Sequence, residues 1–152
     1  MFRSTLLLAA FCAATTSSAA AQAHAQSIEG AWHADSYVMK SGQSHPVVGH
    51  IFFADGQWTV LFFVTDGDGE PRRGSGEGGS YTREGDRLVF THLFNLSVGE
   101  AMAGLQESPL RMVARGADGA PTEETIARIM GDRLTLEFPS GNSMTFLRAT
   151  AP

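Results

Sequence analysis

The sequence predicts an all-β protein, a single antiparallel up-and-down β-barrel of eight or nine strands that follows a signal peptide. Short runs of β-branched, aromatic and aliphatic residues are separated by Gly, Asp, Asn and Pro, which is the pattern of antiparallel strands. No convincing helical period interrupts these runs. Each run has one apolar face, so the strands must close on themselves or stack as two sheets, and their meander order favours a barrel.

The N-terminus has the three parts of a secretory signal peptide. A basic start is followed by an apolar run over residues 6–11 and a small-residue stretch over residues 17–25. Cleavage could follow Ala21, Ala23 or Ala25, and we expect it after Ala25. The apolar run is shorter than the roughly 20 residues that a membrane-spanning helix needs. We therefore expect a periplasmic or secreted protein without a transmembrane segment.

Removal of residues 1–25 leaves residues 26–152 as one domain. The chain has 11 basic and 16 acidic residues and a net charge of −5, which argues against nucleic acid as a partner. Its one cysteine, Cys12, lies in the signal peptide. The domain therefore has no disulfide or thiol chemistry, and its stability must come from its core.

Strands are expected near residues 31–39, 47–54, 57–65, 78–83, 87–98, 110–115, 123–130, 133–138 and 143–148. The Gly-rich, acidic stretch 66–79 and the stretch 99–109 are expected to be non-strand segments that border a barrel mouth. The second could hold a turn of helix around residues 101–105. Residues 66–70 alternate carboxylates as a calcium loop does, but Pro71 stands where such a loop needs glycine, so a solvated loop is the better interpretation.

The dipeptide Asp55-Gly56 predicts a tight hairpin, and this turn fixes which residues face each other. The pairs are Phe53 with Trp58, Ile51 with Val60, Gly49 with Phe62, and Val47 with Val64. This face should point into the barrel, because the opposite face carries polar residues as well.

The outward face of the same hairpin combines His50 with an apolar patch made by Phe52, Leu61 and Phe63. Exposed apolar surface usually marks a partner or a covering segment. Either the segment 99–109 covers this patch or a homodimer forms through it.

The tetrapeptide Gly-Asp-Arg-Leu occurs at residues 85–88 and again at 131–134, and each copy predicts a tight hairpin. Around the second turn, the inward residues are Thr125, Ala127, Ile129, Leu134, Leu136 and Phe138. Around the first turn, the inward residues are Tyr81, Leu88, Phe90, His92 and Phe94. The same alternation leaves Thr91, Asn95 and Ser97 outside. His92 and Tyr81 are then polar groups in an apolar interior.

Two short motifs at the ends of the domain resemble the lipocalin signature. They are Gly30-Ala31-Trp32 at the start of the first strand and Phe146-Leu147-Arg148 in the last. The resemblance implies that Trp32 closes one end of the barrel and that Arg148 packs across it. A guanidinium over an indole contributes up to ~2 kcal/mol when desolvated.

The chain resembles more closely the bacterial lipocalin-like domain family, over most of residues 28–149. The ordered motifs are Gly30-Ala31-Trp32, Gly49 with Asp55-Gly56, Gly79-Ser80-Tyr81, and Thr91-His92. Leu93 replaces a second histidine that often follows in this family, so a two-histidine site loses support. The resemblance implies a fold and a ligand-holding shape more than a chemistry, and it implies no cofactor.

Five residues are the candidate ligand-binding set: Tyr81, His92, Phe62, Phe90 and Phe94. A neutral imidazole and a phenol in an apolar space could orient a ligand carbonyl or hydroxyl, or could simply satisfy each other or a buried water. The first hypothesis is a binding protein for a small apolar or amphipathic molecule. The second is an isomerase or cyclase helped by His92, Tyr81 or Arg83. The third is an interaction module whose barrel is filled by aromatic side chains.

No metal site is expected from the histidines that remain after cleavage. His33 and His50 should point outward, His45 should lie in a turn, and His92 should point inward. The domain also lacks a cysteine nucleophile and a G-x-S-x-G motif, so hydrolase chemistry finds no support.

Overall fold

The computed structural model describes residues 27–149, so the predicted signal peptide lies outside the described residues. Nine antiparallel strands make up this part: β1 (Gly30–Val38), β2 (Ser44–Ala54), β3 (Gln57–Thr65), β4 (Pro71–Glu84), β5 (Arg87–Gly99), β6 (Ser108–Ala114), β7 (Thr122–Met130), β8 (Arg133–Glu137) and β9 (Ser143–Arg148). Within residues 27–149 no helix has the length and apolarity to cross a membrane.

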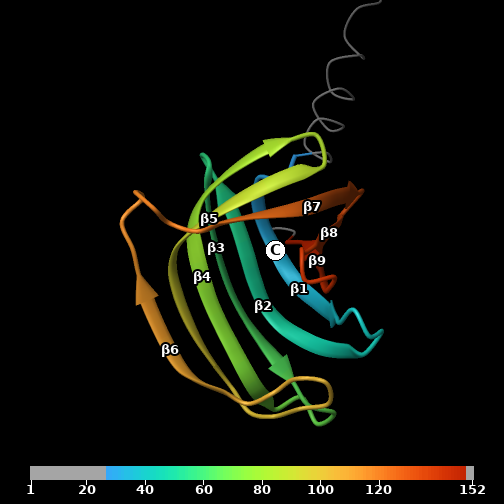
Figure 1. Ribbon diagram of the computed structural model, residues 1–152. Coiled ribbons are helices and arrows are strands. Elements are labelled where there is room, and N and C mark those ends of the chain that lie inside the picture. The colour runs from blue at the N-terminus through green and yellow to red at the C-terminus, as the bar shows by residue number, and fades with distance from the viewer. Residues whose placement is uncertain (1–26, 150–152) are drawn as a thin grey trace, which may run out of the picture.

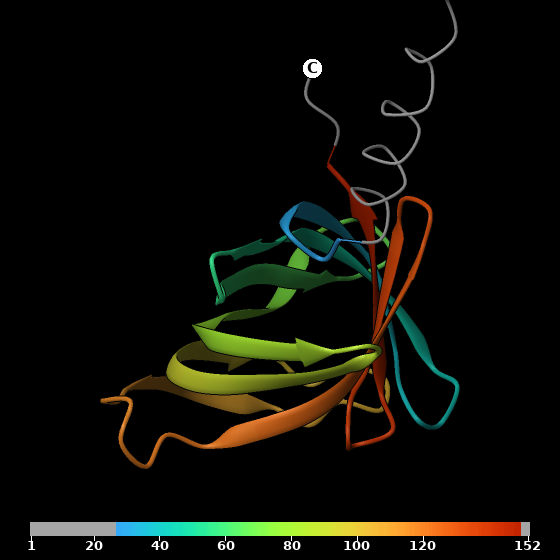
Figure 2. The same ribbon diagram turned by 90° about the horizontal axis from the view of Figure 1, so that it is seen from above.

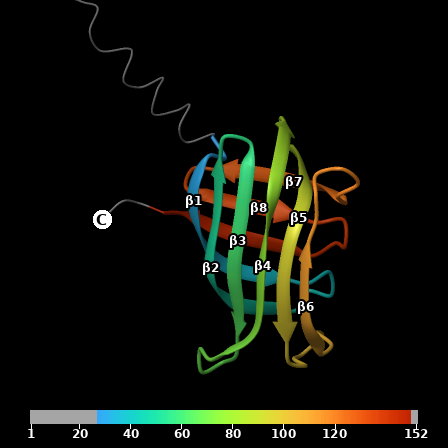
Figure 3. The same ribbon diagram turned by 90° about the vertical axis from the view of Figure 1, so that its left-hand side faces the viewer.

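Eight of the strands form a closed barrel. The sheet order is β4-β3-β2-β1-β9-β8-β7-β5, and a further pairing of β4 with β5 closes the circle, while β6 pairs with β5 outside it. Figure 1 shows β6 diverging from the barrel, and Figure 2 shows the curvature of the strands from above. Figure 3 shows β2 to β6 side by side, with β7 and β8 crossing behind them. The predicted all-β barrel is confirmed.

The turn between β2 and β3 sets the predicted register. Asp55 and Gly56 have φ angles of +50° and +73°, as a type I′ turn requires. The four predicted pairs, from Phe53 with Trp58 to Val47 with Val64, are all present. Phe53 is 1% exposed on the inner face, whereas Leu61 on the outer face is 53% exposed. The predicted direction of this hairpin is therefore confirmed.

The turn between β7 and β8 also follows its prediction. Ile129 pairs with Leu134 and Ala127 pairs with Leu136. Ala127, Leu134 and Leu136 are buried, as is Thr125. These residues join a core that runs through the barrel, with β9 contributing Met144 and Phe146.

Trp32 and Arg148 close one end of the barrel, as the sequence motifs predict. Trp32 is fully buried, and the Arg148 guanidinium carbon lies 4.0 Å from its ring centroid. The Trp32 Nε1–H donates to the Ile28 carbonyl over 2.8 Å. Arg148 also donates to the Ser27 carbonyl at 2.9 Å and to the Glu29 carbonyl at 3.3 Å. The segment before β1 is thereby held across this end.

The stretch 66–79 departs from its prediction, because β4 begins at Pro71 and includes the glycine-rich residues. Only the turn before it is a loop, in which Asp66 Oδ1 accepts the Asp68 and Glu70 amides. Glycine-rich strands lack the side chains that give a strand its sequence pattern, which explains the error. Residues 101–105 are also not helical, and the Met102 and Leu105 backbones instead bond each other reciprocally at 2.9 Å.

A β-bulge in β5 overturns the prediction that Phe94 lines the interior. Gly78 pairs with Phe94 but Gly79 pairs with His92, so Leu93 is an extra residue in the ladder. The extra residue reverses the inside-outside alternation. Phe94 consequently lies on the outer surface, 46% exposed.

Beyond the bulge, Asn95 and Ser97, predicted to lie outside, turn inward. β5 also changes its neighbour near the bulge: residues 87–91 pair with β7, and residues 94–99 pair with β6. The bulge therefore lies close to the point where the barrel wall divides.

Candidate functional site

The barrel interior holds a cavity of about 230 Å³ next to the closed end. Its apolar wall includes Trp58, Phe62, Phe90, Leu136, Met144 and Phe146. Its polar wall is made by Glu77, His92 and Glu123, with Tyr37 and Asn142 on another side. An apolar cavity with a few convergent polar groups is the usual form of a small-molecule site.

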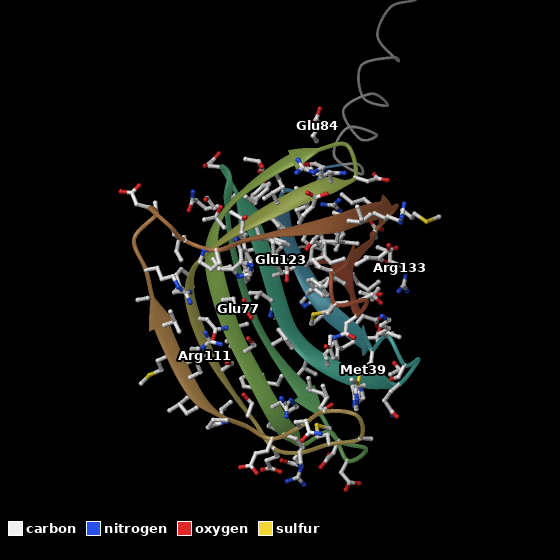
Figure 4. All side chains as sticks on the ribbon, in the orientation of Figure 1. Met39, Glu77, Glu84, Arg111, Glu123 and Arg133 are labelled. Carbon is white, nitrogen blue, oxygen red and sulfur yellow. The ribbon has the colours of Figure 1, made fainter. Side chains whose placement is uncertain are left out.

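Glu77 and His92 form a hydrogen-bonded pair across β4 and β5. His92 Nδ1 lies 3.1 Å from Glu77 Oε2, and the Ser75 hydroxyl donates to Glu77 Oε1 over 3.0 Å. Burial alone would raise the pKa of Glu77, but the bonds from His92, Ser75 and Asn95, together with the nearby imidazole charge, outweigh burial and lower that pKa. Figure 4 shows Glu77 and Glu123 within the barrel. Glu77 is therefore held as a carboxylate inside the cavity.

Glu123 is the second carboxylate of the cavity and stands at the start of β7. Burial raises its pKa, the charge of Glu77 adds to this effect, and His92 and Thr125 oppose it. Its side chain accepts a hydrogen bond from the Thr125 hydroxyl at 3.4 Å. Two carboxyl groups with pKa values moved in opposite directions thus face one imidazole.

Tyr37 and Asn142 provide the other polar edge. The Asn142 side-chain amide donates to the Tyr37 hydroxyl over 2.7 Å. Burial raises the pKa of Tyr37, while the Asn142 bond and the charge of Arg73 oppose the rise. Tyr37 is therefore a neutral phenol at neutral pH.

A second cavity of about 230 Å³ shares Tyr37 and Phe62 with the first. It is lined by Arg73, whose Nη1 donates to the Gln106 carbonyl at 2.7 Å and also to the Glu100 carbonyl. This guanidinium is held by the segment between β5 and β6 and does not line the first cavity.

Trp58 forms part of the wall beside His92. Its ring packs on Phe90 at 4.4 Å and meets the His92 ring edge-on at 5.3 Å. Trp58 is 6% exposed, and its Nε1 is buried without a hydrogen-bond partner among the described residues. A buried N–H group without a partner costs about 1–3 kcal/mol, so the protein tolerates an unsatisfied donor beside the cavity.

Three of the five predicted binding residues, Phe62, Phe90 and His92, line the cavity. Tyr81 does not, because its hydroxyl donates to the Glu29 carboxylate at the closed end and its ring packs against Phe53. Burial, together with the bond to Glu29, raises the pKa of Tyr81. The structure therefore does not bring Tyr81 and His92 together.

Arg83, which the enzyme hypothesis named beside His92, also lies outside the cavity wall. Its Nε donates to the Gly85 carbonyl over 2.8 Å within the turn between β4 and β5.

Five polar residues of the cavity, Tyr37, Glu77, Glu123, Ser140 and Asn142, were missed from the sequence, and two of them had a signal. Glu77 alternates with Ser75 between Gly74, Gly76 and Gly78, which is a period of two that predicts a strand with one polar inner face. Glu123 continues the inward series of Thr125, Ala127 and Ile129. Tyr37 had no such signal, because a register shift in β1 after Ala34 changes the alternation. Ser140 and Asn142 lie between β8 and β9, outside the strands, where the sequence pattern does not predict the direction of a side chain.

The histidines are spread over the molecule. His33 and His50 point outward as predicted and pack together, with ring centroids 4.5 Å apart. His45, predicted in a turn, is a buried residue of β2. In the part of the chain that the structure describes, no group of three or more His, Cys, Asp and Glu side chains is placed to hold a metal ion.

The comparisons with known proteins add a distant structural likeness. No family model matches the sequence, and no curated protein matches it either. A lipocalin-like protein from Bacteroides uniformis has a similar crystal structure, with 16% identity and a TM-score of 0.49 over 80% of this chain and 98% of that one. The fold is lipocalin-like. This description of the fold rests on the closed barrel of antiparallel strands and on the buried Trp32 under Arg148. The structural similarity to the Bacteroides protein is too distant to indicate a function.

Proposed function

We propose that the protein is an exported binding protein that holds one small amphipathic molecule inside its barrel. The observation that supports this proposal is a cavity of about 230 Å³. Its wall is aromatic and aliphatic, and it contains one polar cluster formed by Glu77, His92 and Glu123. Titratable groups with perturbed pKa values inside a cavity are typical of functional sites. A barrel filled by its aromatic side chains would leave no such space, which weighs against the interaction module.

Export belongs to the same proposal. It rests on the basic, apolar and small-residue order within residues 1–25, with cleavage after Ala25. A binding protein outside the cytoplasm meets ligands in the periplasm or the surrounding medium.

Native mass spectrometry of protein purified from its own host tests the binding proposal. We expect a complex whose mass exceeds that of the chain by one small molecule, which is released on collisional activation. If the host protein carries nothing and the purified protein also takes up no nine-carbon alcohol in calorimetry, the proposal is wrong.

An enzyme is the second candidate, and the Glu77–His92 pair beside Glu123 favours it. An imidazole held by a carboxylate can move a proton, and a carboxyl with a raised pKa can keep one. Wild-type protein and His92→Gln would be incubated with the compound captured from the host. Catalysis predicts a chemical change with the wild type alone, whereas a binding protein leaves the compound unchanged and His92→Gln retains most of the affinity.

We also propose that two copies associate through the outer face of β3 and its neighbours. Phe52, Leu61 and Phe63 are 46%, 53% and 38% exposed, and Phe94 and Leu96 extend the apolar surface across the glycines of β4. Sedimentation should give a dimer mass for the wild type and a monomer mass for Phe63→Glu. Met130→Glu, a change at a 79% exposed residue of β7, is the control and should remain a dimer. An unchanged mass for Phe63→Glu rules this dimer out.

A further inference from the structure

The cavity holds more acidic groups than basic ones. Its ionisable lining residues are Glu77, Glu123, His92 and Tyr37, and none of the residues that line it, all within residues 27–149, is Lys or Arg. With both carboxyl groups ionised, even a protonated imidazole leaves an excess negative charge. Arg73 belongs to the neighbouring cavity and is bonded to backbone carbonyls there. The electrostatic field in the first cavity therefore favours a cation.

The two carboxylates differ in how far the protein itself satisfies them. Glu77 accepts from Ser75 at 3.0 Å and lies 3.1 Å from His92, so both of its oxygens have partners. Glu123 accepts from the Thr125 hydroxyl at 3.4 Å and forms no ion pair within residues 27–149. Burying an ionised carboxylate without a cation is costly. A positively charged group in the cavity would stabilise Glu123 most.

Trp58 belongs to the wall of the same cavity. Its side chain is 6% exposed and lines the cavity, and its Nε1–H has no partner among the described residues. The Nε1 atom itself is covered by the surrounding wall, so the carboxyl groups are the polar groups that meet a guest. A head group with a basic nitrogen would satisfy Glu123.

We propose that the ligand is an amphipathic amine, whose protonated nitrogen lies between Glu123 and the Glu77–His92 pair. Its hydrocarbon part packs on the apolar wall formed by Phe62, Phe90, Leu136 and Met144. This inference rests on the proposed binding function and names the ligand class for the same cavity. Carboxylate amphiphiles of the same length are excluded, because their head group would lie beside two carboxylates.

Three probes of equal chain length test the inference: nonylamine, 1-nonanol and nonanoate. Their affinities would be measured by calorimetry at pH 7, with protein purified after expression of the complete chain. A charge-assisted hydrogen bond to Glu123 should make nonylamine bind about tenfold more tightly than 1-nonanol. Nonanoate should bind more weakly than the alcohol.

A matched pair of variants locates the effect. Glu123→Gln removes the charge inside the cavity and should weaken nonylamine binding by about tenfold while changing 1-nonanol binding less than about twofold. Glu124→Gln removes the same charge from the next residue, which points outward and pairs with Arg87 at 2.7 Å. That variant should bind all three probes as the wild type does.

The outcomes separate the two proposals. If none of the probes binds, the amine inference is overturned, and the binding function fails with it when the protein from its own host also carries no small molecule. If 1-nonanol or nonanoate binds as tightly as nonylamine, the cavity is a binding site but the amine inference is overturned. Equal losses of nonylamine affinity in Glu123→Gln and Glu124→Gln would overturn it too, because the attraction would then come from the charge of the whole molecule.

Discussion

The closed end of the barrel and the cavity next to it belong to the same barrel, yet the tryptophans of the two regions differ in their hydrogen bonding. Trp32 is fully buried, donates to the Ile28 carbonyl and lies under Arg148. Trp58 is nearly as buried, but its Nε1 has no hydrogen-bond partner among the described residues. At the closed end the buried indole N–H has a hydrogen-bond acceptor, whereas beside the cavity the buried indole N–H has none. Such an unsatisfied group is expected where a protein binds something.

Replacing each tryptophan by phenylalanine tests this comparison with the same chemical change in both regions. Trp32→Phe removes the bond to Ile28 and weakens the contact with Arg148, so it should cost about 3 kcal/mol of unfolding free energy. Trp58→Phe breaks no hydrogen bond and should cost less than about 1.5 kcal/mol. Urea denaturation measures both values. Equal losses of unfolding free energy would mean that Trp32 at the closed end and Trp58 at the cavity contribute equally to stability, which would contradict this comparison.

The bulge that aims His92 into the cavity can be tested at Gly79. A Cβ on Gly79 would lie 1.9 Å from the Thr91 carbonyl oxygen, so Gly79→Ala forces the two strands apart. We expect a loss of about 1–3 kcal/mol, as in overpacked interiors. Gly76→Ala is the control, because the nearest atom to its Cβ would be 3.7 Å away, and it should change stability by less than about 0.5 kcal/mol.

Urea denaturation of the Gly79→Ala and Gly76→Ala variants measures the two losses of unfolding free energy. A Gly79→Ala variant as stable as Gly76→Ala would show that the strands separate there without cost and that the bulge does not depend on glycine.

The inward and outward directions predicted from the sequence hold for β5 up to this bulge and fail after it. Turn residues and the period of two determined the β2–β3 and β7–β8 hairpins, because each turn fixes the register of the strands beside it. Trp32 and Arg148 were predicted to meet from their motifs, and they do. Phe94 was misplaced because one extra residue reverses every side chain after it, and Leu93 looks like an ordinary strand residue.

The candidate site was less predictable than the fold, for a reason specific to β4. The strand presents glycines outward and Ser75 and Glu77 inward, so it has no apolar face to reveal it. His92 was found because its hairpin partners are apolar, whereas its partner Glu77 was hidden in a stretch that reads as a loop. Glu123 could have been found by extending the inward series of β7 by one step.

The smallest expected effect compares the two carboxyl groups of the cavity, which face His92 from different strands. The pKa of Glu123 is raised in the folded protein, so ionisation of this group opposes folding, and its contribution to stability is lost as pH rises above its ordinary value of 4.5. The pKa of Glu77 is lowered, so this group stabilises the fold above 4.5 and loses that effect as pH falls through its folded-state pKa. Glu123→Gln should therefore raise the melting temperature at pH 7 relative to the wild type, and Glu77→Gln should lower it. Both differences should shrink at pH 4 in thermal unfolding, and shifts in the same direction at pH 7 would contradict the opposite roles of these two groups.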